Sequence, residues 1–273
     1  MNMAAGITTD LDAKAGPAGL FDLQGRVALV TGGTGGLGLA FVRALAEQGA
    51  QVVLSDLDGE RTTRAAQTFT SEGLPVSAHA CDVGNKAACE ALIDEVLQRH
   101  GRIDTLVSNA GVEGRVGPMS SGSAADWERM LSINLMAAVW LTGRALPAMA
   151  AQGEGSVTLV ASIAGLRGNK AIGPYGVSKA ASIELARSLA VEWGPRAVRV
   201  NALCPGLIRT PFSEALLADE SFMQRRLAAT PLRRVGEPHE IAGIAAMLAS
   251  RAGAFITGQA IVADGGTLIS DGG

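Results

Sequence analysis

The chain has 273 residues, of which 48% are hydrophobic and 18% charged, and its formal net charge is −3. This composition suits a folded domain with a substantial core and excludes a disordered chain, while the absence of a basic block argues against a nucleic-acid partner. No apolar run reaches the ~18 residues of a membrane span, so we expect no membrane partner.

The first 22 residues are predicted to form a flexible extension. They contain Asp10, Asp12, Lys14 and a glycine- and proline-containing stretch at 16–19, and they lack the continuous apolar run of a signal peptide. No repeat and no linker divides residues 23–273, so we predict one domain there.

Short apolar runs alternate with longer amphipathic runs along this domain. Buried strands are predicted at residues 26–31, 51–56, 76–81, 103–107, 155–161, 198–203 and 259–263. Helices are predicted at 36–49, 58–72, 85–100, 126–151, 174–193 and 237–250, with a bend at Pro147. This alternation predicts the α/β class, with a doubly wound parallel sheet of seven strands and helices on both faces.

A glycine-rich turn, TGGTGGLG at residues 31–38, stands between the first predicted strand and helix. Glycines let the backbone approach a pyrophosphate closely, and the helix start offers free N–H groups and its positive dipole end. The turn fits both T-G-x-x-x-G-x-G and G-x-G-x-x-G, and Gly38 belongs to both registers. We predict a dinucleotide site here, with a merely flexible loop as the alternative.

Asp56 ends the second predicted strand, where an acid can accept hydrogen bonds from ribose hydroxyls and would repel a 2′-phosphate. No basic residue lies in the glycine-rich turn, and Leu57 follows the acid, so NAD is favoured over NADP. The alternative is that Asp56 only caps the helix beginning near Asp58. Asp82, after the third strand, could bond adenine or form the turn before Gly84.

Tyr175 and Lys179 are the only tyrosine and one of four lysines, and four residues separate them. This spacing places both side chains on one helix face, where the ammonium would lower the phenol pKa from its usual ~10. Tyr175 is therefore a candidate general acid or base, although a tyrosine on a buried helix is usually core.

Two more polar residues stand near the ends or middles of predicted elements. Ser162 follows a strand and could bond the substrate oxygen, or it could cap the turn before Gly165. Asn134 lies inside the apolar stretch of the long helix, where asparagine is unfavourable. A water-linked proton relay is one explanation, and a helix-kinking or packing role is the other.

The order and spacing of these motifs resemble those of the short-chain dehydrogenase/reductase superfamily, in its compact ~250-residue branch. The resemblance spans about residues 23–268 and selects the T-G-x-x-x-G-x-G register. It includes an N-A-G motif after the fourth strand, a P-G-x-x-x-T segment at 205–210, and the signatures ITGQ at 256–259 and DGG at 264–266. Ser108 and Ala263 depart from it, because the family usually has Asn and Val there.

The resemblance implies a single-domain Rossmann fold and a particular set of site residues. The cofactor-binding residues that it implies are Gly32, Thr34, Gly35, Gly36, Leu37, Gly38, Asp56, Leu57, Cys81, Asp82, Val83, Asn109, Ala110, Gly111, Tyr175, Lys179, Pro205, Gly206, Ile208 and Thr210. It also implies four catalytic residues: Tyr175 as acid/base, Lys179 to lower its pKa and bond the nicotinamide ribose, Ser162 to orient the reacting oxygen, and Asn134 to support a water-linked proton path.

The function implied is an NAD(H)-dependent oxidoreductase that transfers a hydride between nicotinamide and a secondary alcohol or ketone. Alternatives are an NADPH-dependent 3-oxoacyl-(acyl carrier protein) reductase-like enzyme and a non-catalytic NAD-binding regulator. The resemblance further suggests a homotetramer. Three cysteines without paired spacing favour the cytoplasm, and the three histidines, His79, His100 and His239, lack metal-ligand spacing, so no metal is expected.

Variable loops at 112–121, 163–173 and 207–230 are expected to bind the substrate, the last of them as a lid. Five arginines lie in or near this lid: Arg209, Arg225, Arg226, Arg233 and Arg234. They could meet an anionic substrate, or they could form ordinary surface ion pairs.

Overall fold

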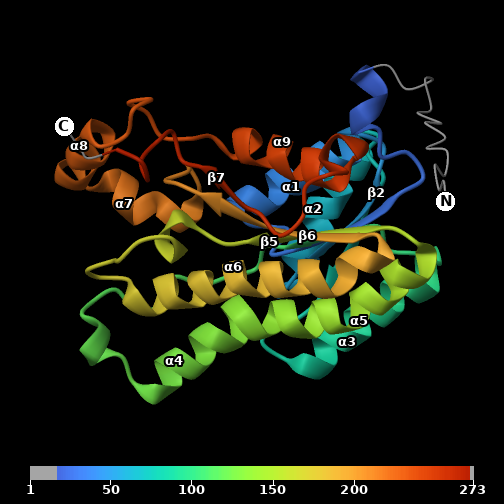
Figure 1. The fold of residues 1–273 in the computed structure, drawn as a ribbon, viewed down its shortest axis with the longest axis horizontal. Coiled ribbons are helices and arrows are strands. Elements are labelled where there is room, and N and C mark those ends of the chain that lie inside the picture. Colours follow the sequence, from blue (N-terminus) through green and yellow to red (C-terminus); the bar gives the residue numbers. More distant parts are fainter. Residues whose placement is uncertain (1–16, 271–273) are drawn as a thin grey trace, which may run out of the picture.

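The computed structural model describes residues 17–270, and its centre is a parallel sheet (Figure 1). The strands are β1 (Val27–Thr31), β2 (Gln51–Asp56), β3 (Val76–Ala80), β4 (Thr105–Ser108), β5 (Gly155–Val160), β6 (Val198–Pro205) and β7 (Ala260–Ala263). Their spatial order is β3-β2-β1-β4-β5-β6-β7, and every neighbouring pair is parallel. The predicted seven-stranded parallel sheet is confirmed.

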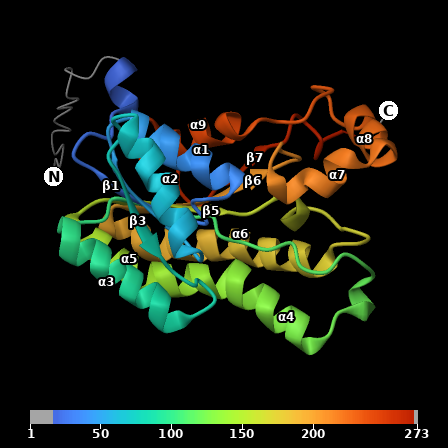
Figure 2. The same cartoon turned by 180° about the vertical axis from the view of Figure 1, so that it is seen from behind.

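Helices cover both faces of this sheet, as Figures 1 and 2 show from opposite sides. One face carries α1 (Gly36–Glu47), α2 (Gly59–Ser71) and α9 (Pro238–Ala249). The other face carries α3 (Lys86–His100), α5 (Ala137–Gln152) and α6 (Gly173–Trp193). The doubly wound Rossmann arrangement follows from this layering.

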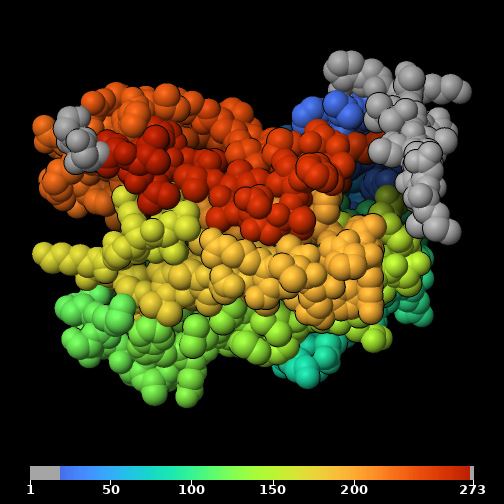
Figure 3. All heavy atoms as spheres, in the orientation of Figure 1, coloured from blue at the N-terminus to red at the C-terminus, as the bar shows by residue number. Residues whose placement is uncertain are grey.

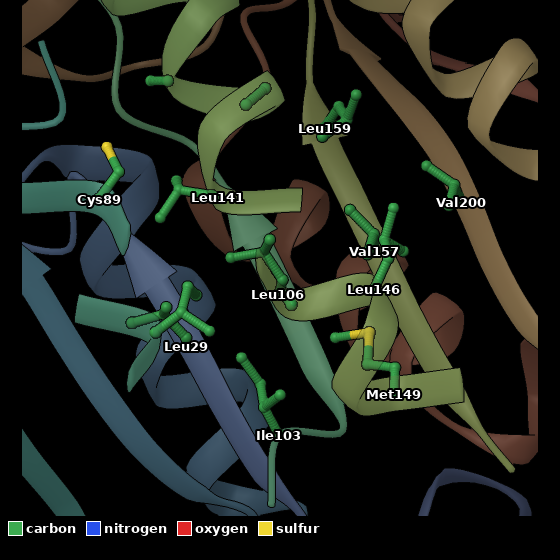
Figure 4. Close-up of a cluster of buried hydrophobic side chains, with 14 of the residues drawn as sticks. Leu29, Cys89, Ile103, Leu106, Leu141, Leu146, Met149, Val157, Leu159 and Val200 are labelled. Carbon is green, nitrogen blue, oxygen red and sulfur yellow. The ribbon is translucent and has the colours of Figure 1, made fainter. Parts of the chain in front are cut away.

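The strands are apolar on both faces because both faces are covered. Val27 and Leu29 of β1 point into the cluster under α3, α5 and α6, whereas Ala28 and Val30 point into the cluster under α1, α2 and α9. Figure 4 shows the first cluster, where side chains of four strands meet α5. Labelled there are Leu29, Leu106, Val157 and Val200 from the strands and Leu141, Leu146 and Met149 from the helix.

The amino ends of the strands are held together by a buried carboxylate, Asp104, which is 5% exposed. Its oxygens accept hydrogen bonds from the Val27 backbone N–H at 2.8 Å and from the Arg102 Nε at 2.8 Å. Arg26 also contacts Asp104 at 3.2 Å and forms an ion pair with Glu154. This network lies at the edge of the sheet opposite to the edge where ligands bind in such folds.

The helix predicted over residues 126–151 is interrupted. It consists of α4 (Ala124–Leu131), a π-helical turn η3 (Ser132–Met136) and α5. The π turn lies at Asn134, whose side chain bonds a neighbouring loop, and such turns often mark functional positions. Pro147 lies inside α5, which continues to Gln152.

The long segment between β6 and α9 lies at the carboxyl ends of the strands. Between β6 and α9 the chain forms a short turn η6 (Pro211–Ser213) and two helices, α7 (Glu214–Ala218) and α8 (Glu220–Ala228). Of the extension predicted over 1–22, residues 1–16 lie outside the described residues, and Pro17–Phe21 forms a 3₁₀ helix, η1. No described helix is long and apolar enough to span a membrane.

Candidate active site

A cavity of about 490 Å³ opens at the carboxyl ends of the strands, where β1 and β4 diverge into loops. It is lined by all twenty residues that the sequence analysis assigned to the cofactor, and by Ser162. In the space-filling view, the orange helices α7 and α8 and the yellow segment after β5 adjoin at this end of the molecule (Figure 3). The predicted residues are therefore gathered in one site by the sheet topology.

The glycine-rich turn is packed too tightly for side chains. Gly32 has φ +63°, and a Cβ there would lie 2.8 Å from the Ala110 Cα. A Cβ on Gly38 would collide with the Gly32 carbonyl oxygen, and one on Gly36 would lie 2.8 Å from the Thr210 Cβ. Helix α1 then begins without a side-chain cap, so its first N–H groups are available to an anion. This cradle fits the pyrophosphate of a dinucleotide.

Asp56 is bound to the glycine-rich turn. One carboxylate oxygen, Oδ2, accepts hydrogen bonds from the Thr34 backbone N–H at 3.0 Å and from the Thr34 hydroxyl at 2.6 Å. Helix α2 is capped by Asp58, whose side chain accepts a hydrogen bond from the Arg61 N–H at 3.0 Å. The helix cap is therefore Asp58, and the cap-only interpretation of Asp56 was wrong.

Arg61 is a cation that the sequence analysis did not assign to the site. Its Nη2 donates to the Thr34 carbonyl oxygen at 2.9 Å, and the side chain lines the cavity near Asp56 and Leu57. The sequence shows no basic residue inside the glycine-rich turn, and Arg61 lies far from that turn along the chain. The first turn of α2 brings its side chain to Thr34. The part of the cavity beside the end of β2 thus holds both an acid and a guanidinium.

Two other strand ends complete the cofactor side. Asp82 lines the cavity and accepts a hydrogen bond from the Gly84 N–H at 2.9 Å, so it also forms the predicted turn. The Asn109 side chain donates to the carbonyl oxygens of Thr31 and Gly32, each at 3.0 Å. This amide fixes the start of the glycine-rich turn against the end of β4.

Tyr175 and Lys179 both project from the first turns of α6 into the cavity. The Lys179 Nζ lies 5.6 Å from the centre of the Tyr175 ring and donates a hydrogen bond to the Val160 carbonyl oxygen at 2.8 Å. Ser162 follows β5, and its hydroxyl accepts a hydrogen bond from the Ala164 N–H at 3.1 Å. The serine therefore caps the turn, as one interpretation expected, and also faces the cavity.

The pKa of Tyr175 is raised, whereas the sequence predicted that Lys179 would lower it. Burial raises this pKa to about 12, the nearby Ser162 hydroxyl lowers it, and the charge of Glu113 raises it. Burial also lowers the pKa of Lys179 to about 8. Burial is the largest cause of both shifts, so the ammonium of Lys179 loses its proton at a lower pH than the phenol of Tyr175 does.

Asn134 lies behind the cavity and does not line it. Its Oδ1 accepts from the Val112 N–H at 2.8 Å, and its Nδ2 donates to the Val112 carbonyl oxygen at 2.9 Å and to the Ser178 hydroxyl at 3.1 Å. These bonds join the π turn to the loop after β4 and to α6. Asn134 thus holds cavity-lining loops in place, in keeping with the predicted packing role.

The cavity also holds charged residues to which the sequence gave no individual role. Glu113, Arg129 and Arg167 line it together with Arg226 of α8. Phe212 packs against Tyr175 with ring centres 6.1 Å apart. Glu113 and Arg167 lie in two of the loops that were expected to bind the substrate, and none of the three residues belongs to a motif.

Comparisons with known proteins agree with this architecture. A family model described as enoyl-(acyl carrier protein) reductase matches residues 32–267. Dehydrogenase/reductase SDR family member 4 from Sus scrofa is 40% identical over 245 residues, which make up 90% of this chain and 88% of that protein. A tropinone reductase homolog from Arabidopsis thaliana is 39% identical over 251 residues, 92% of this chain and 81% of that protein.

Solved structures are similar over nearly the whole chain. A gluconate 5-dehydrogenase from Burkholderia cenocepacia in complex with NADP and tartrate has a TM-score of 0.90 and 33% identity, covering 93% of this chain and 99% of that one. Levodione reductase has a TM-score of 0.85 and 33% identity, covering 90% and 99%. The chain belongs to the short-chain dehydrogenase/reductase superfamily, and it is an oxidoreductase of CH–OH and carbonyl groups.

Proposed function

We propose that the protein is an NAD(H)-dependent oxidoreductase that interconverts a secondary alcohol and a ketone, with Tyr175 as general acid/base. The observation that carries this proposal is the convergence of Tyr175, Lys179 and Ser162 on a cavity that also contains the glycine-rich cradle. A bound nicotinamide supplies the hydride chemistry, and the chain supplies alignment and proton handling.

The proton is handled at the Tyr175 hydroxyl. In ketone reduction the phenol donates its proton to the forming alkoxide, and in alcohol oxidation the phenolate accepts it. Ser162 orients the substrate oxygen beside that hydroxyl, and Lys179 contributes positive charge close to the ring. Asn134 positions the loop at Val112 and the start of α6, and we propose that it supports a water-linked path to Lys179.

NAD is the proposed cofactor because Asp56 presents a carboxylate at the end of β2. The negative charge of Asp56 disfavours the 2′-phosphate of NADP, whereas the positive charge of Arg61 favours it. An acid at the end of the second strand typically accepts hydrogen bonds from the ribose hydroxyls, so we infer that Asp56 decides the preference. The solved relatives with NADP show that this preference has to be measured.

A second candidate is an NADPH-dependent reductase of 3-oxoacyl groups on a carrier protein, favoured by Arg61 and by the family model's description. A third is a regulator that binds NAD without turnover. The first two are separated by comparing free ketones with carrier-linked 3-oxoacyl substrates. Oxidation of NADH by the protein with any substrate would exclude the regulator.

The test of the proposed function is Tyr175→Phe, assayed by NADH absorbance against a panel of alcohols and ketones. We expect the variant to lose about 10²- to 10⁴-fold in activity while binding NADH as the wild type does. Full activity in this variant would refute the role of Tyr175. An inactive wild type that binds NADH tightly would favour the regulator.

We also propose a homotetramer in the cytoplasm. Val177 and Val191 on α6 are 46% and 81% exposed, which fits burial of this helix against a second copy. Cys81, Cys89 and Cys204 are all free and buried, as expected in a reducing compartment. Light scattering coupled to size-exclusion chromatography measures the oligomeric state directly.

A further inference from the structure

Only one of the five lid arginines faces the cavity. Arg209 forms an ion pair with Glu237 at 2.9 Å, Arg234 binds both oxygens of Glu240, and the Arg233 guanidinium donates to the Ala228 carbonyl oxygen. Arg225 is exposed and does not line the cavity. Arg226, the next residue on α8, is partly buried and lines it together with Tyr175 and Phe212.

A second guanidinium reaches the same cavity from a different segment. Arg167 follows the turn η4 (Ile163–Gly165), on the loop between β5 and α6. This loop is fixed by Asn169, whose side-chain amide donates to the carbonyl oxygens of Ala164 at 2.8 Å and Arg167 at 2.9 Å. Figures 1 and 2 both show this loop at the same end of the molecule as α7 and α8.

These two cations are not neutralised within residues 17–270. Neither forms an ion pair with a carboxylate there, and the charge of Arg167, together with burial, lowers the pKa of Arg226. The charge of Asp264 raises the pKa of Arg226, but the two residues form no ion pair, and the Asp264 oxygens accept hydrogen bonds from the N–H groups of Gly266 and Leu268. Arg226 is partly buried and Arg167 is exposed, and their guanidinium groups repel each other, so an anion that binds between them relieves this repulsion.

We infer that Arg167 and Arg226 bind an anionic group of the substrate, a carboxylate or a phosphate, through charge-assisted hydrogen bonds. This inference rests on the proposed function, because it assigns the substrate class of the same site. Guanidinium groups match the oxygens of both anions in geometry and charge. Glu113 acts on the Tyr175 phenol through its charge, so we expect the anionic group at the end of the substrate remote from the reacting carbonyl.

The experiment compares matched ketones of one chain length that end in a carboxylate, a phosphonate or a neutral amide. Their kcat/KM values with NADH are measured for the wild type, Arg226→Gln, Arg167→Gln and the control Arg225→Gln. We expect the wild type to prefer an anionic ketone over the amide by at least about tenfold. Each cavity variant should lose about tenfold of this preference through KM, and Arg225→Gln should keep it.

A binding measurement separates failure of this inference from failure of the proposed function. Titration calorimetry on protein saturated with NADH compares glutarate, inorganic phosphate and neutral glutaramide. Weaker binding of either anion to Arg226→Gln and Arg167→Gln, but not to Arg225→Gln, supports the subsite even if no ketone is reduced. Reduction without preference for anionic ketones, or an unchanged preference in both cavity variants, overturns it.

Discussion

Thr34 and Asp56 are joined by two hydrogen bonds to one carboxylate oxygen, at 3.0 Å from the threonine N–H and 2.6 Å from its hydroxyl. Asp56, which we propose binds the cofactor ribose, is therefore held on the turn that we propose binds the pyrophosphate. Arg61 bonds the same threonine from the other side, through its carbonyl oxygen. A substitution of Asp56 therefore alters the contacts of Thr34 as well, and through Thr34 those of Arg61.

We predict that Asp56→Ser lowers the preference for NADH over NADPH by about 10- to 100-fold, because the repulsion of a 2′-phosphate is lost and Arg61 is left as the nearest charge. The ratio of kcat/KM values with the two cofactors measures this. Adding Arg61→Gln should remove much of the gained use of NADPH. The control is Asp58→Ser, which keeps a helix cap and should keep the preference. Unchanged discrimination in Asp56→Ser would contradict the assignment.

The sole tyrosine makes the phenol of the site directly measurable. Tyrosinate absorbance in the ultraviolet should develop at a pH well above the usual ~10, since burial raises the pKa of Tyr175 to about 12. Removal of the negative charge in Glu113→Gln should lower this pKa, and Ser162→Ala should raise it. Tyr175→Phe gives the background, and circular dichroism checks that the fold persists at each pH. A midpoint near 10 in the wild type would refute the effect of burial.

Lys179→Met should reduce alcohol oxidation most strongly below about pH 8. Burial lowers the pKa of Lys179 to about 8, so the wild type carries the ammonium below that pH and loses it above. The ratio of wild-type to variant activity should therefore be about tenfold or more at neutral pH and should narrow as the pH rises. The measurement is a pH profile at saturating cofactor. A ratio independent of pH would mean that the charge is not what the lysine contributes.

Asp104→Asn should destabilise the fold by about 3 kcal/mol without a direct effect on the cavity. Burial opposes ionisation of Asp104, but hydrogen bonds from Arg102, the Val27 N–H and Arg26 outweigh it and lower its pKa. The stabilisation is therefore present above the unfolded pKa of ~3.9 and is lost as the pH falls through the lowered folded value.

Urea unfolding of Asp104→Asn at neutral and acidic pH measures this effect, and the gap to the wild type should close in acid. Glu154→Gln is the control, because its side chain is 45% exposed and its loss should cost less than about 1 kcal/mol. An equal loss in both variants would contradict the special role of the buried carboxylate.

The sequence was sufficient to predict the sheet, because strands such as 26–31 contain an unbroken apolar run, here at residues 27–30. It also predicted which residues meet at one cavity, since motifs at the ends of parallel strands meet at one edge of the sheet. The π turn at Asn134 was not predicted, because apolar spacing does not separate a wide helical turn from an ordinary one.

The sequence predicted which loops would bind the substrate, but not which of their side chains face the same cavity. Arg167 and Arg226 are distant in the chain and share no motif, so only the packed lid shows that they face one cavity. The reversed pKa order of Tyr175 and Lys179 was missed for a related reason. The spacing along a helix predicts which side chains are neighbours, but the extent of their burial depends on the segments packed over them.

The placement of the Asp104 network at the far edge of the sheet has an evolutionary consequence. The side-chain bonds of this network involve none of the residues that face the cavity. Mutations that remodel the lid can therefore accumulate without eroding the scaffold, and new specificities can arise by small steps. Two relatives with 33% identity to this chain, one named for gluconate and one for levodione, illustrate such divergence on a shared framework.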